Sequence, residues 1–176
     1  TFNSQQEAIA GQFGAMGVTR FGSDLKAANT ELSKLGFSAE ESQKAISDIS
    51  NQFGISVQES AKLVQDAGEI AVGLGMSLDE STKLLGTLTT IGGLTSQQAT
   101  DLAKQTASLA EANNVAPDEV LNDIANNTEL FAKFAKDGGA NVARAAIQAR
   151  KLGVEIGDIT DSMEGMLDFQ GSLNAE

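Results

Sequence analysis

Apolar residues recur along most of this chain at intervals of three and four, the spacing that places side chains on one face of an α-helix. The first such stripe is Phe21, Leu25, Ala28, Leu32 and Leu35. Further stripes follow at Ile46, Ile49 and Phe53; Leu84, Leu88 and Ile91; Ala99, Leu102, Ala103 and Ala110; Val120, Ile124, Phe131 and Phe134; Val142, Ala145, Ala146, Ala149 and Leu152; and Ile156, Ile159, Met163 and Met166. Because no segment alternates apolar and polar residues as a half-buried strand does, the pattern predicts an all-α fold of eight or nine short helices.

A short recurring phrase separates the stripes. It consists of glycine, an apolar residue, serine or threonine, and glutamate or glutamine three residues later. Full copies occupy residues 35–41, 53–59, 74–80 and 92–98, a weaker copy occupies 113–119, and partial copies begin at Gly17 and Gly153. Such a phrase is typical of a helix end, a turn of about two residues and a new helix start.

Each position in the phrase has a mechanical role. Glycine, or Asn114 in the weaker copy, suits the left-handed conformation just after a helix, and the next apolar residue can fold back on the last turn. Serine or threonine then caps the following helix, and glutamate or glutamine closes a capping box. Ala116 is a poor cap, but Pro117 fits the first helical position. We therefore expect Glu41, Glu59, Glu80 and Glu119 to act as capping residues.

The distances between the phrases predict a repeat. The successive glycines at 36, 54, 75 and 93, with Asn114, lie 18, 21, 18 and 21 residues apart, which gives a two-helix unit of 39 residues. A further 39 residues separate Asn114 from Gly153, with a break expected at Gly138-Gly139. Periods of this size are characteristic of stacked helical hairpins. We expect an N-terminal helical segment at 1–18, tandem helical-hairpin repeats at 19–152, and a C-terminal helix and linker at 153–176.

Composition narrows the possible functions. The 176 residues include no Cys, His, Trp or Tyr, which excludes thiolate chemistry, zinc–cysteine sites and histidine as a general base. The net charge of −12 argues against a sequence-specific nucleic-acid surface, which is usually basic. No apolar run is long enough to span a membrane. Because the first residue is Thr1 rather than Met, we expect a piece of a longer polypeptide.

The candidate chemistry is sparse. Asp158 and Asp161 lie three apart on a predicted helix, but an acidic-pair hydrolase needs a cleft around them, so a solvated acidic face is the preferred interpretation. The basic cluster of Arg144, Arg150 and Lys151 is interpreted as charge complementing a helix C-terminus rather than as a phosphate site. No catalytic, cofactor-binding or metal-ligating residue is assigned, no cofactor is expected, and we do not expect an enzyme.

The recurring phrases, together with residues 149–154 and 166–173, resemble tail tape measure proteins of bacteriophages and prophages. The matching segments read Ala149-Arg150-Lys151-Leu152-Gly153-Val154 and Met166-Leu167-Asp168-Phe169-Gln170-Gly171-Ser172-Leu173, with Glu176 in the place of the family's closing glutamate. Residues 93–99 also follow the family's habit. The likeness covers the second half of the chain well and the first half more loosely.

The resemblance implies a structural role in the virion tail. Tape measure proteins are long helical chains in the lumen of the tail tube; their length sets tail length, and they leave the tube when DNA is ejected. The implied partners are other copies of the chain, as a trimer or hexamer, and tail tube and tail-tip proteins. No specific nucleic acid is implied, and membrane contact is expected only during ejection. The frequent glycine breaks favour a folded helical domain over an extended ruler helix.

A rival interpretation remains open. A helical-repeat module that binds a peptide or protein would show the same 39-residue period, and the period supports both classes equally. A long parent chain encoded among tail genes would favour the tape measure, whereas a short parent chain would favour the binding module.

Overall fold

The computed structural model describes residues 18–134 and 139–159, and within these ranges all regular structure is helical. Eight α-helices are accompanied there by one π-helical and one 3-10 segment. They are α2 (Val18–Lys34), α3 (Ala39–Phe53), α4 (Val57–Leu74), α5 (Leu78–Gly86), η1 (Thr87–Ile91, π-helical), α6 (Ser96–Ala112), α7 (Pro117–Asn126), α8 (Thr128–Phe134), α9 (Ala140–Lys151) and η2 (Ile156–Ile159, 3-10). The predicted all-α class is confirmed.

The four full phrases form the predicted capping boxes. Ser38, Ser56, Ser77 and Thr95 are the N-caps of α3, α4, α5 and α6, and each is extended in backbone conformation. In each box the cap oxygen accepts a hydrogen bond from the backbone three residues later, at 3.2 or 3.3 Å. The glutamate or glutamine at that position accepts from the cap backbone in return. Two otherwise unpaired helix-end donors are thus satisfied at each of these four starts.

The helix ends also follow the predicted rule. Gly36, Gly54, Gly75, Gly93 and Gly153 have positive φ, and Asn114 takes their place with φ 57°. The apolar residue that follows folds back, since the backbone N–H of Phe37 donates to Leu32 and that of Met76 donates to Ala71, both at 3.0 Å. These are the 6→1 bonds of a Schellman ending. The stop signals in the sequence are therefore real turns.

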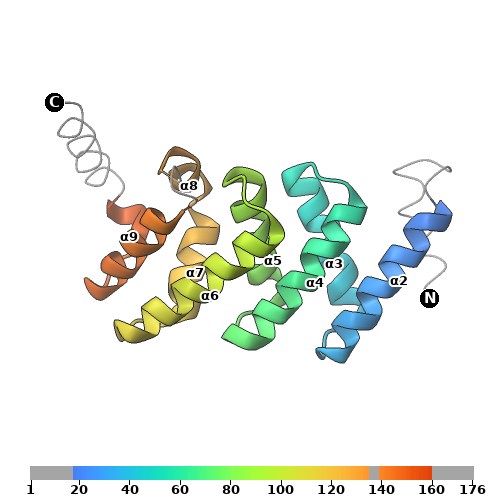
Figure 1. Ribbon diagram of the computed structural model, residues 1–176, viewed down its shortest axis with the longest axis horizontal. Coiled ribbons are helices and arrows are strands. Elements are labelled where there is room, and N and C mark those ends of the chain that lie inside the picture. Colours follow the sequence, from blue (N-terminus) through green and yellow to red (C-terminus); the bar gives the residue numbers. More distant parts are fainter. Residues whose placement is uncertain (1–17, 135–138, 160–176) are drawn as a thin grey trace.

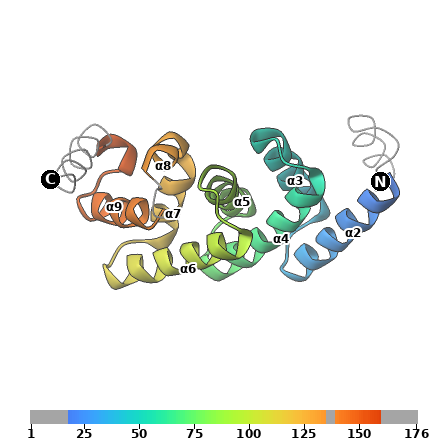
Figure 2. The same cartoon turned by 45° about the horizontal axis from the view of Figure 1, so that its top comes forward.

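The helices pack as two rows. One row contains α2, α4 and α6, and the other contains α3, α5 and α7, with contacts both along and between the rows (Figure 1). The turned view shows the same arrangement, with α2 and α9 at opposite ends of an elongated array (Figure 2). Each row therefore packs against the other along the array. The helical-hairpin repeat and its 39-residue period remain predictions.

One apolar core runs through the array, and in part of it the buried side chains are small. On α6 the buried side chains Ala99, Ala103, Ala107 and Ala110 share one face, which allows neighbouring helix axes to approach closely. Larger residues such as Leu32, Ile49 and Leu84 fill the space elsewhere. Most of the predicted stripes are therefore buried. Leu152 is an exception, with 76% of its surface exposed, because α9 has ended and Val154 donates its backbone N–H to Ala149 instead.

Two breaks were not anticipated by the stripes. The apolar face from Val120 to Phe134 does not belong to one helix, because the chain turns at Asn127, whose side-chain amide donates 2.8 Å to the Asp123 carbonyl. At the end of α5, the Thr89 hydroxyl donates 2.7 Å to the Leu85 carbonyl and competes with the backbone for it. The helix there widens into the π-helical η1.

Several expectations lie wholly or partly outside the described residues. Residues 1–17 are not described, so neither the N-terminal segment 1–18 nor the partial phrase at Gly17 can be placed, and Thr19 lies inside α2 rather than capping it. Gly139 has φ 94° at the start of α9, as expected of the break there, but Gly138 is not described. Of the C-terminal stripe, the structure describes only the short turn η2, and Met163 and Met166 lie beyond it.

Candidate interaction surface

The acidic pair considered from sequence does not form a described site. Asp158 accepts a hydrogen bond from the Glu155 backbone at 3.2 Å and so closes a local turn, while Asp161 lies outside the described residues. Among residues 18–134 and 139–159, no group of three acidic side chains is placed to hold a metal ion. Within the same ranges, no helix has the length and apolar character needed to cross a membrane.

Arg150 has a role that its sequence interpretation missed. Its Nε and Nη2 donate to the two carboxylate oxygens of Asp123 at 2.7 and 2.5 Å, and Glu119 and Glu155 lie 3.7 and 3.6 Å away. The surrounding carboxylates, Asp123 first, raise the pKa of Arg150 above its ordinary value. The guanidinium therefore links α7 to α9, and Arg150 and Lys151 also lie in the last turn of α9, as expected from the sequence. The prediction that Glu119 closes a capping box at the start of α7 is wrong: Ala116 has no side chain that can cap the helix, and the Glu119 carboxylate lies near Arg150 instead.

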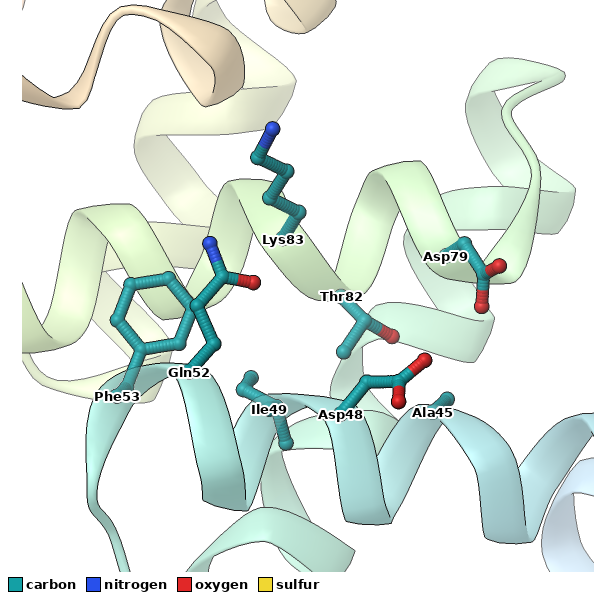
Figure 3. A pocket seen from close by; sticks show the side chains of 8 residues that line it. All are labelled: Ala45, Asp48, Ile49, Gln52, Phe53, Asp79, Thr82 and Lys83. Carbon is teal, nitrogen blue, oxygen red and sulfur yellow. The ribbon is translucent and has the colours of Figure 1, made fainter.

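A groove lies between α3 and α5, within the part of the chain that the structure describes (Figure 3). Its volume is about 160 Å³, close to that of cavities of about 150 Å³ that admit a benzene-sized group. Residues of α3 and α5 line it: Ala45, Asp48, Ile49, Gln52 and Phe53 from the former, and Asp79, Thr82 and Lys83 from the latter. The groove has room for one side chain rather than for a helix.

One end of the groove is acidic and already holds a cation. Asp48 and Asp79 approach from opposite helices, and the ammonium of Lys44 lies 3.0 Å from the first carboxylate and 2.8 Å from the second. The hydrogen bonds to Asp79 and then to Asp48 raise the pKa of Lys44. Because all three side chains are more than half exposed, the ammonium is held weakly in energetic terms. Two carboxylates share one positive charge.

The floor of the groove combines apolar surface with one unsatisfied polar atom. Ile49 is buried and Phe53 half-buried, and together with Ala45 they make an apolar wall. Thr82 is 4% exposed, and its hydroxyl has no hydrogen-bond partner among the described residues. Its oxygen lies on the side of Asp48 and Asp79 (Figure 3). Buried polar atoms are nearly always paired. The side chains of Asn29 and Thr87 are also unpaired, but of the three only Thr82 lines one of the two described hollows.

The opposite rim of the groove is tied to α7. The Lys83 ammonium points away from the acidic end and donates 2.7 Å to the Asn126 side-chain oxygen (Figure 3). Nearby, the Asn122 amide donates 3.0 Å to Glu80. These bonds hold α5 against α7, so the lysine of the groove does not neutralise its two carboxylates.

A second hollow, of about 290 Å³, lies beside the π-helical segment. Its lining comes from the turn before α4, from α4 itself, from η1, and from the turn before α6 and its first residue: Ile55, Glu59, Leu63, Thr89, Thr90, Leu94 and Ser96. Burial, followed by repulsion from Glu69, raises the pKa of nearby Asp66, which is hydrogen-bonded to Ser96. None of the side chains that line this hollow carries a buried polar atom without a partner, so the groove between α3 and α5 is the better candidate site.

Comparisons with known proteins do not assign a function. No protein-family model, curated protein or solved structure matches the chain. The groove itself was missed from sequence, because Asp48 and Asp79 are brought together only by the way α3 packs against α5.

Proposed function

We propose that this chain is a non-catalytic assembly segment of a phage or prophage tail tape measure protein, which acts by binding other copies of itself and tail tube or tail-tip proteins in the virion. The observation that carries the proposal is the set of glycine-apolar-serine phrases, on which the resemblance to that family rests. Their capping boxes and left-handed ends build a folded array from α2 to α7. A folded array fits an assembly role better than an extended ruler helix.

The second candidate function is a helical module that binds a peptide or protein outside any virion. The α3–α5 groove favours it, since a small acidic groove on the surface of the array is a place where a side chain of a peptide or protein can bind. The two candidates share their chemistry and differ in the parent chain and its location.

A deletion tests the assembly role. Removing the 39 residues from Ser38 to Met76 joins Phe37 directly to Ser77, so the turn and the capping box of α5 survive. We expect tail length to stay constant in electron micrographs, with fewer assembled or infectious particles, because a folded unit adds contacts rather than length. Extended helix would instead shorten the tail by about 58 Å, at about 1.5 Å per residue. Normal infectious particles would show that this unit is dispensable and would contradict the proposal.

A further inference from the structure

We propose that the α3–α5 groove binds an arginine side chain of a partner protein, with the guanidinium between Asp48 and Asp79. This inference rests on the proposed role in protein binding and names the chemistry of the partner. It does not depend on the partner being a tail protein. Three features of the groove support it: its charge, its unsatisfied hydroxyl and its apolar wall.

The charge of the groove calls for a cation. The carboxylates of Asp48 and Asp79 are close enough to share the ammonium of Lys44, which leaves one negative charge uncompensated. Lys83 does not supply the missing charge, because its ammonium is bound to Asn126. The net charge of −12 on the whole chain also favours a basic partner and speeds its approach. An anionic ligand would meet two carboxylates at once.

The hydroxyl of Thr82 discriminates between cations. It is buried at the groove, on the side of the two carboxylates, and lacks a partner among the described residues (Figure 3). Its oxygen is closed off from solvent, so an incoming donor reaches it only after neighbouring side chains shift, and one of its two acceptor lone pairs is then satisfied. Guanidinium carries five N–H donors in a planar fork and can reach two carboxylates and a hydroxyl together, whereas the three donors of an ammonium radiate from one point. Arginine therefore fits better than lysine.

The apolar wall provides a surface on which the methylene groups of the arginine side chain can pack. Ile49 and Phe53 lie along the groove away from the acidic end (Figure 3). Arginine buries its methylene groups on such surface while its charged head stays polar. The volume of about 160 Å³ admits one such side chain. Lys44, which is more than half exposed, would yield its place to the incoming guanidinium at little cost.

The test uses the 176-residue chain and a defined probe. N-acetyl-arginine-N-methylamide is titrated into the ¹⁵N-labelled protein, and backbone amide shifts are followed by NMR. Its uncharged isostere, the citrulline derivative, and the lysine derivative are titrated in parallel. We expect saturable shifts centred on residues 48, 79 and 82 with arginine, weaker ones with lysine and none with citrulline. Equal shifts with arginine and citrulline, or arginine shifts spread over all acidic faces, would overturn the proposal.

Variants with opposite expected signs sharpen the test. Asp48→Asn and Asp79→Asn should each weaken arginine binding about fivefold, which corresponds to about 1 kcal/mol, while Lys44→Gln should strengthen it by removing the competing ammonium. Thr82→Val keeps the shape of the side chain and removes its hydroxyl. It should therefore reduce the difference in affinity between the arginine and lysine derivatives. Asp101→Asn on α6 makes the same charge change outside the groove and should leave affinity unaltered. Weaker binding in Lys44→Gln would contradict the competition on which the site is built.

The outcome is separable from that of the proposed function. Presence of the chain in purified tails does not involve the groove. A chain found in tails that binds no arginine would refute this inference alone, and a chain that binds arginine but is absent from tails would refute the tape measure assignment alone.

Discussion

The ion pair between Arg150 and Asp123 should contribute far more to stability than any other described salt bridge, and it should do so asymmetrically. The Asp123 side chain is 4% exposed, and both its oxygens accept from the guanidinium. Replacing Arg150 by Met keeps an unbranched apolar stem but removes the guanidinium, which leaves a carboxylate buried without its partner. Replacing Asp123 by Leu leaves the guanidinium beside Glu119 and Glu155.

The geometry sets the expected magnitudes. Breaking a buried pair by removing one partner costs about 3–5 kcal/mol, and because Arg150 is itself 20% exposed the lower end applies, so we expect Arg150→Met to cost about 3 kcal/mol. Asp123→Leu should cost about 1 kcal/mol, since two other carboxylates remain near the guanidinium. The double variant should recover most of the loss of Arg150→Met, because an apolar pair of similar volume can replace a buried ion pair.

Urea denaturation followed by far-ultraviolet circular dichroism measures these differences as changes in the free energy of unfolding. A matched control is Lys34→Met, which removes the exposed ion pair with Glu31, 2.7 Å long but more than half exposed on both sides. It should change stability by no more than about 1 kcal/mol. If Arg150→Met cost no more than Lys34→Met, or if the double variant were as unstable as Arg150→Met, the account of this joint would be refuted.

Three further predictions concern the turns. Ser56→Ala removes a capping oxygen and should lower the free energy of unfolding in urea by about 1 kcal/mol, whereas an unchanged value would mean that the cap is dispensable. A Cβ added at Gly54 or Gly75 meets no atom within 4 Å, so we expect the positive φ to dominate the cost of Gly54→Val and of Gly75→Val, at about 1–2 kcal/mol each; an unchanged melting temperature would contradict the left-handed turns. Hydrogen bonds from the Ser77 backbone and side chain lower the pKa of Glu80, so its contribution to stability is present at neutral pH and is lost as pH falls through the acid range. The midpoint of urea unfolding should therefore change less between pH 7 and pH 3.5 in Glu80→Gln than in the parent chain. An equal change in both proteins would rule out a contribution of Glu80 ionisation to stability.

The local structure was largely predictable because it is encoded within single phrases. Glycine at a left-handed position, a polar cap and a glutamate three residues later act over seven residues and need no knowledge of distant contacts. The turn at Asn114 was predictable for the same reason, since asparagine adopts positive φ more readily than most other residues that carry a side chain. The apolar stripes similarly identified most of the buried faces.

The features that were not predicted depend on contacts between residues far apart in the chain, or on competition between a hydroxyl and a backbone N–H for one carbonyl. Arg150 lies 27 residues from Asp123, and Lys44 lies 35 residues from Asp79, so their pairing follows only from how the helices stack. The π-helical segment arises where the Thr89 hydroxyl takes the Leu85 carbonyl, although threonine in the sequence does not distinguish this from an ordinary helix. Spacing alone also could not show that the chain bends at Asn127.

The most direct test of the assembly role is mass spectrometry of tail particles purified after induction of the source genome. We expect tryptic peptides of this chain, such as residues 63–83, to be recovered from tails in constant ratio to the tube protein. An abundant cytoplasmic protein of the same lysate serves as the control for contamination. Recovery of these peptides from the lysate but not from the purified tails would show that the chain is not part of the tail.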